Sequence, residues 1–165
     1  MADVMTPEQR SRCMAAIKGK DTKQEVMVRK FLFSKGLRYR LNSRKLPGSP
    51  DIVLKKYKTV IFVDGCFWHG HEGCKYFRLP KSNTLFWKAK ITRNIERDME
   101  TTQALKDFGW KVIRIWECEL RNKSSREAAL NKLFNDITCS VVKKYSIEEA
   151  DILVAAEPKA PYSTD

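Results

Sequence analysis

The run Thr59–Val63 (TVIFV) decides the expected fold, because its side chains are almost continuously apolar. A strand with one face in water alternates apolar and polar residues, whereas a strand covered on both faces does not. The run therefore predicts a central β-strand buried on both faces. The preceding segment Asp51–Leu54 predicts a second strand, and Lys55–Lys58 is a tight connection through which the two strands can pair as a hairpin.

Further strands and a long helix surround this hairpin. Asn83–Phe108 carries apolar side chains at helical spacing and is followed by Gly109, which suits the end of a helix. Lys111–Trp116 predicts another strand, which the upstream helix places in the same sheet by a crossover. Leu37–Leu41 alternates with basic residues and predicts a strand before the hairpin. The order of elements predicts an α/β fold with a small mixed sheet between helices.

Two capping-box patterns and the ends of the chain set the expected domain limits. Thr22–Glu25 and Ser124–Glu127 each have the spacing that opens a helix. No repeat or low-complexity linker divides the chain, so we expect one domain. We expect a basic arm over residues 1–20, the domain over 21–145 and a loose, flexible tail over 146–165.

The chain is strongly basic, with 32 Lys and Arg against 20 Asp and Glu and a net charge of +12. The first 45 residues hold 12 basic and 4 acidic side chains, so most of the excess lies there. Such a charge favours a polyanionic partner, with nucleic acid the leading class, over a basic surface that serves solubility alone. No apolar run is long enough to span a membrane and the first residues lack a signal-peptide core, so we expect a cytoplasmic protein with reduced thiols.

Two of the five cysteines and one histidine stand at metal-ligand spacing. Cys66, His71 and Cys74 follow one another as C-x4-H-x2-C, directly after the central strand. A structural zinc site needs a fourth ligand, and Cys118 supplies it if its strand neighbours the central one. The alternative is a coincidence of buried thiols and a surface histidine. Cys13 and Cys139 have no such spacing, and we expect both to be small apolar fillers.

Two carboxylates suggest a second metal site. Hairpin pairing would bring Asp51 and Asp64 to the same end of the sheet, where Mg²⁺ could be held by carboxylates, waters and phosphate oxygens. From spacing alone, ordinary turn or cap residues are the better interpretation of this pair. His69 is the candidate for proton transfer, because its reference pKa of about 6.5 suits acid or base catalysis near neutrality. It could instead replace His71 as a zinc ligand.

Aromatic rings lie among basic residues, an arrangement that can stack on bases or wedge between them. Phe67 and Trp68 lie in the expected zinc loop, and Trp87, Lys90 and Asn94 share one face of the long helix. Core packing is the alternative. It is the expected role of Phe86 and Trp110, whereas for Phe67, Trp68 and Trp87 both interpretations stay open.

Taken together, these motifs resemble the very-short-patch (Vsr) mismatch-repair endonucleases over residues from about 10 to 135. The segments that carry the resemblance are residues 14–25 (MAAIKGKDTKQE), 46–51 (LPGSPD), 60–71 (VIFVDGCFWHGH), 86–91 (FWKAKI), Asn94, 97–98 (RD), 109–112 (GWKV) and 116–118 (WEC). The string GCFWH at 65–69 is the most specific of them.

The resemblance implies a restriction-endonuclease-like fold with a zinc-stabilised loop, acting on double-stranded DNA with a T:G mismatch left by deamination of 5-methylcytosine. Members of the family nick one strand on the 5′ side of that thymine, using Mg²⁺. Carried onto this chain, Asp51 and the carbonyl of Val63 would bind magnesium and His69 would assist proton transfer. Phe67, Trp68 and Trp87 would insert beside the mismatch, and the arm around Met14 would close over the minor groove. The zinc ligands would be Cys66, His71, Cys74 and Cys118.

One departure concerns Asp64. The wider nuclease superfamily has an acid-x-lysine pair on the strand that ends here, and Phe62 and Asp64 stand in those places. Some family members carry histidine at the position of Asp64, so an aspartate there could bind the metal instead of moving a proton.

Three functions remain to be separated: a mismatch nickase, a zinc-stabilised DNA-binding protein without nuclease activity, and a restriction enzyme for paired DNA. A nick needs one active site, so we expect a monomer, with mismatch-repair proteins as candidate partners.

Overall fold

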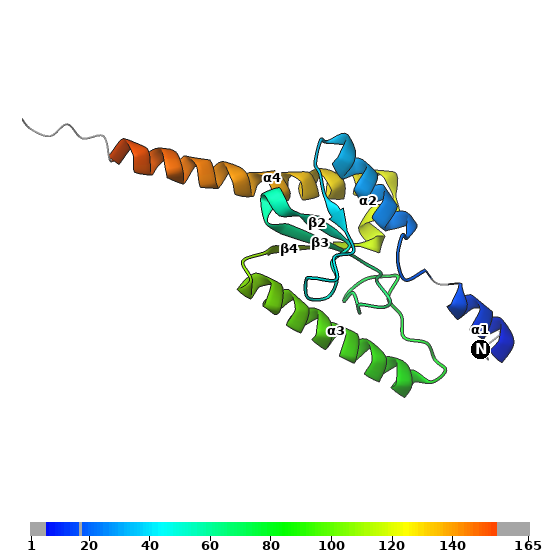
Figure 1. Cartoon of the computed structure of the whole chain (residues 1–165). Helices are drawn as coiled ribbons and strands as arrows, with labels where there is room; N and C mark the ends of the chain where they lie inside the picture. Colours follow the sequence, from blue (N-terminus) through cyan, green and yellow to red (C-terminus); the bar gives the residue numbers. More distant parts are fainter. Residues whose placement is uncertain (1–5, 17, 155–165) are drawn as a thin grey trace, which may run out of the picture.

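The computed structural model describes residues 6–16 and 18–154, with the backbone alone for Pro7, Arg10 and residues 140–154. Over these residues four strands form one mixed sheet in the order β1-β2-β3-β4. Their bounds are Arg40–Leu41, Ile52–Leu54, Thr59–Asp64 and Lys111–Trp116. The two-residue β1 is shorter than the strand expected over residues 37–41. Figure 1 shows the sheet in the middle of the molecule.

The central strand β3 has the two neighbours that its apolar run predicts. It pairs antiparallel with β2 across a short 3₁₀ turn at Lys55–Tyr57, with Ile52 opposite Ile61. It pairs parallel with β4, which the chain reaches through helix α3 (Thr84–Asp107). Because β3 and β4 run in the same direction, the segments that follow Asp64 and Trp116 leave the sheet at the same edge.

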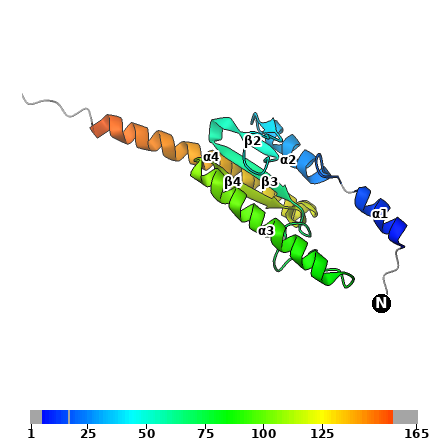
Figure 2. The same ribbon diagram turned by 60° about the horizontal axis from the view of Figure 1, so that its bottom comes forward.

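Helices cover both faces of the sheet, as Figures 1 and 2 show. Helices α2 (Lys23–Ser34) and α4 (Lys123–Val154) lie on one face, over a core that contains Ile61 and Ile115. Helix α3 lies on the other face, where Phe62 and Leu105 belong to a second core cluster. Alternate residues of β3 thus enter opposite cores, which explains why the sequence of this strand is apolar throughout. Asp64 is two residues after Phe62 and therefore lies on the same face of β3, toward α3.

The helix ends agree with most of the expected signals. Thr22 caps α2, and its capping box with Glu25 is present. Asn83 and Phe108 flank α3, as the sequence predicts. The expected box at Ser124–Glu127 is wrong in its position, because α4 already begins at Lys123 and Ser124 lies inside the helix.

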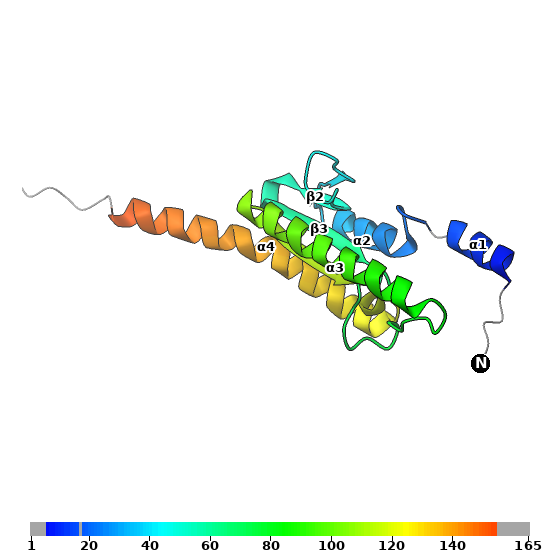
Figure 3. The ribbon, with the colours of Figure 1, turned by 90° about the horizontal axis from the view of Figure 1, so that it is seen from below.

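At the end of the chain, residues 146–154 continue α4, and residues 155–165 lie outside the described part. Near the start, α1 (Pro7–Ala15) begins at the expected proline and lies to one side of the sheet and its helices (Figure 3). The division into arm, domain and tail stays a prediction. Among the described residues no helix is long and apolar enough to cross a membrane.

Candidate active site and metal centre

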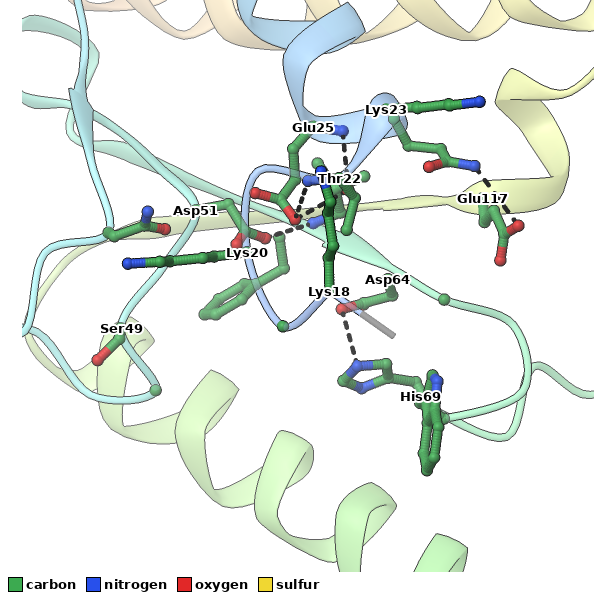
Figure 4. Close-up of a pocket in the computed structure, with 18 of the residues that line it drawn as sticks. Lys18, Lys20, Thr22, Lys23, Glu25, Ser49, Asp51, Asp64, His69 and Glu117 are labelled. Atoms are coloured by element: carbon green, nitrogen blue, oxygen red, sulfur yellow. Dashed lines mark hydrogen bonds and ion pairs between the residues drawn. The ribbon is translucent and has the colours of Figure 1, made fainter. Parts of the chain in front are cut away.

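A cavity of about 780 Å³ lies beside the carboxyl end of β3. Asp51, Asp64 and His69 line it, together with the start of α2. Figure 4 shows their side chains around one space, with three lysines nearby. These lysines are Lys18, Lys20 and Lys23, and Arg44 also lines the cavity. The hairpin argument is therefore correct in its geometry: the two carboxylates lie at the same end of the sheet, in a basic surrounding.

Asp51 is held against β3 by one strong hydrogen bond. The backbone N–H of Val63 donates to its Oδ2 at 2.8 Å. Burial raises the pKa of this carboxyl to about 6, the Val63 hydrogen bond opposes the rise, and the nearby charges of Glu25 and Asp64 add to it. The charge of Arg29 also opposes the rise, yet the pKa stays above its ordinary value. A divalent cation beside Asp51 would stabilise the ionised carboxylate further.

Glu25 belongs to this pocket, and sequence reasoning missed its position. The sequence indicates only its capping role, which it does perform at the start of α2. Its side chain is nevertheless buried, and Arg29 pairs with its Oε2 at 2.7 Å. The arginine one helical turn later is the signal that could have found it, because a buried carboxylate needs a partner.

His69 lies between two carboxylates. Its Nδ1 is 2.5 Å from Oδ2 of Asp98, a residue of α3, and its Nε2 is 3.8 Å from Oδ1 of Asp64. Since a carboxylate accepts hydrogen bonds, the contact with Asp98 places the ring proton on Nδ1 and leaves Nε2 as the basic nitrogen. Such a ring can take a proton at Nε2 and return it, which is the chemistry that the sequence predicts for His69.

Asp64 is 3% exposed and has a partner that the sequence did not indicate. Nη1 of Arg114, on β4, lies 2.6 Å from its Oδ2. Burial raises the pKa of Asp64, while the charges of His69 and Arg114 oppose that rise. The carboxylate is therefore bound on one oxygen and turns the other toward His69 and the cavity.

Cys66, His71, Cys74 and Cys118 come together as predicted, with one ligand atom of each within 4.8 Å of all the others. The two outer cysteines reach one place because Cys66 follows β3 and Cys118 follows β4, which are parallel neighbours. Sγ of Cys118 lies 3.4 Å from Nδ1 of His71. Tetrahedral zinc with bonds of about 2.3 Å to sulfur would separate its ligand atoms by about 3.7 Å. Both the donor set and the spacing fit such an ion.

The loop that contains these ligands packs tightly on α3. Nδ2 of Asn94 donates to the carbonyl oxygen of Trp68 at 2.9 Å. At Gly70 the backbone has a φ of +60°, and an added Cβ would lie 2.6 Å from Cδ1 of Ile95. A positive φ favours glycine, and any larger residue here would also have to displace the end of the Ile95 side chain. The Asn94 amide nitrogen is thus engaged within the protein, and its predicted contact with a base pair stays a prediction.

The aromatic rings form a cluster at the N-terminal part of α3. The ring centroid of Phe67 lies 5.1 Å from that of Trp68 and 5.4 Å from that of Trp87. All three rings are half-buried, and Nζ of Lys90 lies 5.5 Å from the Trp68 ring centroid. These aromatic rings are only partly covered by the protein, and a cation lies beside them. Such a surface can stack against a nucleic-acid base.

Other expectations about apolar residues have mixed outcomes. Trp110 packs on the core cluster below α3, as predicted. Phe86 is 58% exposed, so its expected core role is wrong, because its position on α3 faces away from the sheet. Cys13 and Cys139 are both exposed rather than fillers. Met14 is partly exposed on α1 and available for contact.

Comparison with known proteins identifies the family. The family described as "DNA mismatch endonuclease Vsr" matches residues 2–75. The chain is 52% identical over 141 residues to the type II nicking enzyme V.NmeAIP of Neisseria meningitidis, covering 86% of this chain and all of that protein. It is 43% identical to the type II nicking enzyme V.XorIIP of Xanthomonas oryzae, covering 82% of this chain and 98% of that one.

A further relative carries the family's own name. The chain is 40% identical over 140 residues to the DNA mismatch endonuclease Vsr of Escherichia coli, which covers 84% of this chain and 89% of the relative. The small mixed sheet between helices and the Cys/His cluster agree with the restriction-endonuclease-like fold and the metal-binding loop that the sequence motifs imply. The chain therefore belongs to the Vsr family of DNA mismatch endonucleases, enzymes that cleave phosphodiester bonds of DNA.

Proposed function

We propose that this endonuclease nicks one strand of duplex DNA on the 5′ side of the thymine of a T:G mismatch, by magnesium-dependent hydrolysis. The observation that carries the proposal is the convergence of Asp51, Asp64 and His69 in one cavity with basic walls. The names of the relatives, a mismatch endonuclease and nicking enzymes, support it. A nick requires a single such site, so one chain suffices and we propose that it acts as a monomer.

Asp51, the carbonyl oxygen of Val63 and the free oxygen of Asp64 would hold Mg²⁺. Oxygen donors around a partly buried carboxylate suit this ion, which would activate water and neutralise charge developing on the scissile phosphate. His69 presents Nε2 to the same space and exchanges a proton with the reacting oxygen there, while Asp98 fixes the orientation of the ring through Nδ1. The lysines around the cavity bind the flanking phosphates.

Zinc would be held by Cys66, His71, Cys74 and Cys118, in a structural role. The four ligands tie the loop after β3 to the segment after β4, and no position remains open for a reacting water. Such a site fixes the place of His69, which lies between two of the ligands in sequence.

The aromatic cluster is the proposed mismatch reader. A T:G wobble pair stacks less well on the adjacent base pair than a matched pair does. Less free energy is therefore needed to unstack the mismatch and insert an aromatic ring beside it. Phe67, Trp68 and Trp87 offer those rings from the major groove, and Lys90 adds a cation over the two tryptophan rings. The arm around Met14 closes from the minor groove. Asn94 contributes by holding the Trp68 backbone.

The test is a nicking assay on end-labelled duplexes that differ at a single base. We expect a magnesium-dependent cut 5′ of the mismatched thymine on one strand of the T:G duplex, and intact T:A and C:G duplexes. Equal cleavage of matched DNA would instead identify a restriction enzyme, and cuts on both strands would contradict a nickase. Varied flanking bases in the same series reveal the preferred sequence context.

Trp87→Ala should weaken binding to a T:G duplex without unfolding the protein. Loss of one ring stacked on a base costs about 1–3 kcal/mol, so the Kd for mismatched DNA should rise between about 5-fold and about 160-fold. Fluorescence anisotropy on T:G and T:A duplexes measures the difference. Phe108→Ala, which removes an exposed ring at the other end of α3, is the matched control and should bind like the wild type. A collapsed Tm in Trp87→Ala would instead assign this ring to the core.

A further inference from the structure

We infer that Arg114 is a positioning residue that keeps Nε2 of His69 open for proton transfer; this inference rests on the proposed role of His69. The guanidinium contacts the two carboxylates that flank the imidazole. Nη1 is 2.6 Å from Oδ2 of Asp64, and Nη2 is 3.5 Å from Oδ1 of Asp98 and 3.3 Å from its backbone oxygen. Arg114 therefore joins the end of β3 to the middle of α3, across the place where His69 lies.

The position of Arg114 follows from the sheet register. It stands opposite Phe62, and Asp64 stands opposite Trp116, so the arginine and the aspartate are diagonal neighbours on the face that α3 covers. The guanidinium lies 4.8 Å from the centroid of the Phe62 ring, and Oγ1 of Thr102 is 3.5 Å from Nη2. A stacked guanidinium with contacts on two elements has little freedom to move away.

Arg114 and His69 compete for the same carboxylate. Asp64 is almost fully buried, and a buried carboxylate turns toward the nearest hydrogen-bond donor or positive charge. Because Arg114 binds Oδ2, Oδ1 stays 3.8 Å from Nε2 of His69, beyond hydrogen-bonding distance. The imidazole is thus held by Asp98 on Nδ1, while Nε2 remains available for a reacting oxygen.

Without the guanidinium, a His69 ring that has taken up a proton at Nε2 has no competitor for Asp64. The carboxylate then closes on Nε2, and the imidazole is bound on both nitrogens by Asp98 and Asp64. A ring bound in this way is a poor proton carrier, since the transferable site must first be released. Lysine at position 114 offers one compact ammonium and cannot hold both carboxylates at once, so it should replace arginine only in part.

Steady-state nicking of a T:G duplex by the zinc-loaded protein is the first measurement. Arg114→Gln should lower kcat by about 10- to 100-fold, a part of what a proton-transfer group contributes, with KM within about 2-fold. The kcat of Arg114→Lys should lie between that of Arg114→Gln and that of the wild type. Lys106→Gln removes a positive charge from the exposed last turn of α3 and is the control. Its kcat and KM should equal those of the wild type. A kcat for Arg114→Gln within about 2-fold of the wild type would overturn the inference.

The second measurement does not depend on activity. The chain has only two histidines, so an NMR spectrum of the imidazole nitrogens contains His69 and His71 alone. In zinc-loaded, DNA-free protein, Arg114→Gln should shift the Nε2 signal of His69 and leave His71 in place. If Arg114→Gln does not fold, Arg114→Lys should show a smaller shift of the same signal.

The two measurements fail in distinguishable ways. A shifted His69 signal in a protein that never nicks T:G DNA would reject the proposed function and retain the positioning role. A fall in kcat with unmoved His69 signals would reject the positioning role and retain the function. Displacement of the His71 signals would show that Arg114 acts on the zinc loop as a whole, which also contradicts the inference.

Discussion

Asp51→Ala is expected to lower the nicking rate by at least about 1,000-fold while the variant still binds duplex DNA. A metal ion at a scissile phosphate contributes several kcal/mol to the stability of the transition state, and about 4 kcal/mol corresponds to this factor. Asp51 is the carboxylate fixed on the Val63 N–H, so its loss removes the main proposed ligand. Affinity should be unchanged or higher, since one negative charge leaves a cavity that faces phosphates.

Single-turnover nicking of a T:G duplex over a range of Mg²⁺ concentrations measures this effect, and anisotropy measures binding. Asp51→Asn keeps the size of the side chain and an oxygen that can accept from Val63. It should be equally inactive, yet at neutral pH without Mg²⁺ it should be as stable as the wild type or more so. The reason is that burial raises the pKa of Asp51 to about 6, so the ionised carboxyl opposes folding at neutral pH. Full activity of Asp51→Asn would reject Asp51 as the metal ligand.

Cys118→Ala is expected to lose stoichiometric zinc and much of the stability of the domain. Structural zinc contributes folding free energy directly, and loss of a ligand belongs among the substitutions that cost more than about 4 kcal/mol. For a chain of this size that cost corresponds to a fall in Tm of roughly 10 °C or more. Cys118 also joins the segment after β4 to the loop after β3, so both segments should loosen.

Elemental analysis of the dialysed protein and thermal unfolding measure the two effects together. Cys139→Ala removes an exposed thiol outside the cluster and is the matched control, which should keep its zinc and its Tm. A chelator added to the wild type should reproduce the low Tm of Cys118→Ala. Full zinc content in Cys118→Ala would show that another residue completes the site.

Local signals in the sequence predict the parts of this molecule that depend on neighbours in the chain. The apolar run of β3, the short connection before it and the spacing of Cys66, His71 and Cys74 are all properties of short segments. Even Cys118 was found, because parallel pairing of two predicted strands brings their ends together. The α/β fold and the metal-binding loop follow from these features.

Arg114 and Asp98, which reach the cavity from distant elements, gave no local signal of their contacts. Arg114 looks like one basic residue in a strand, and its role depends on a diagonal contact with Asp64 that exists only in the folded sheet. Asp98 looks like one of many charges on a long helix until His69 is placed beside it. Sequence periodicity shows which face a residue takes, but it does not show which loop packs there.

Four attachments between residues 66 and 70 fix the length of this segment. Cys66 belongs to the metal cluster, the Trp68 carbonyl is bound by Asn94, His69 by Asp98, and Gly70 fits against Ile95. Each attachment joins a different residue to a point on a rigid neighbour, so a single inserted or deleted residue would put every later one out of place. We therefore expect this segment to accept some substitutions but no change in length.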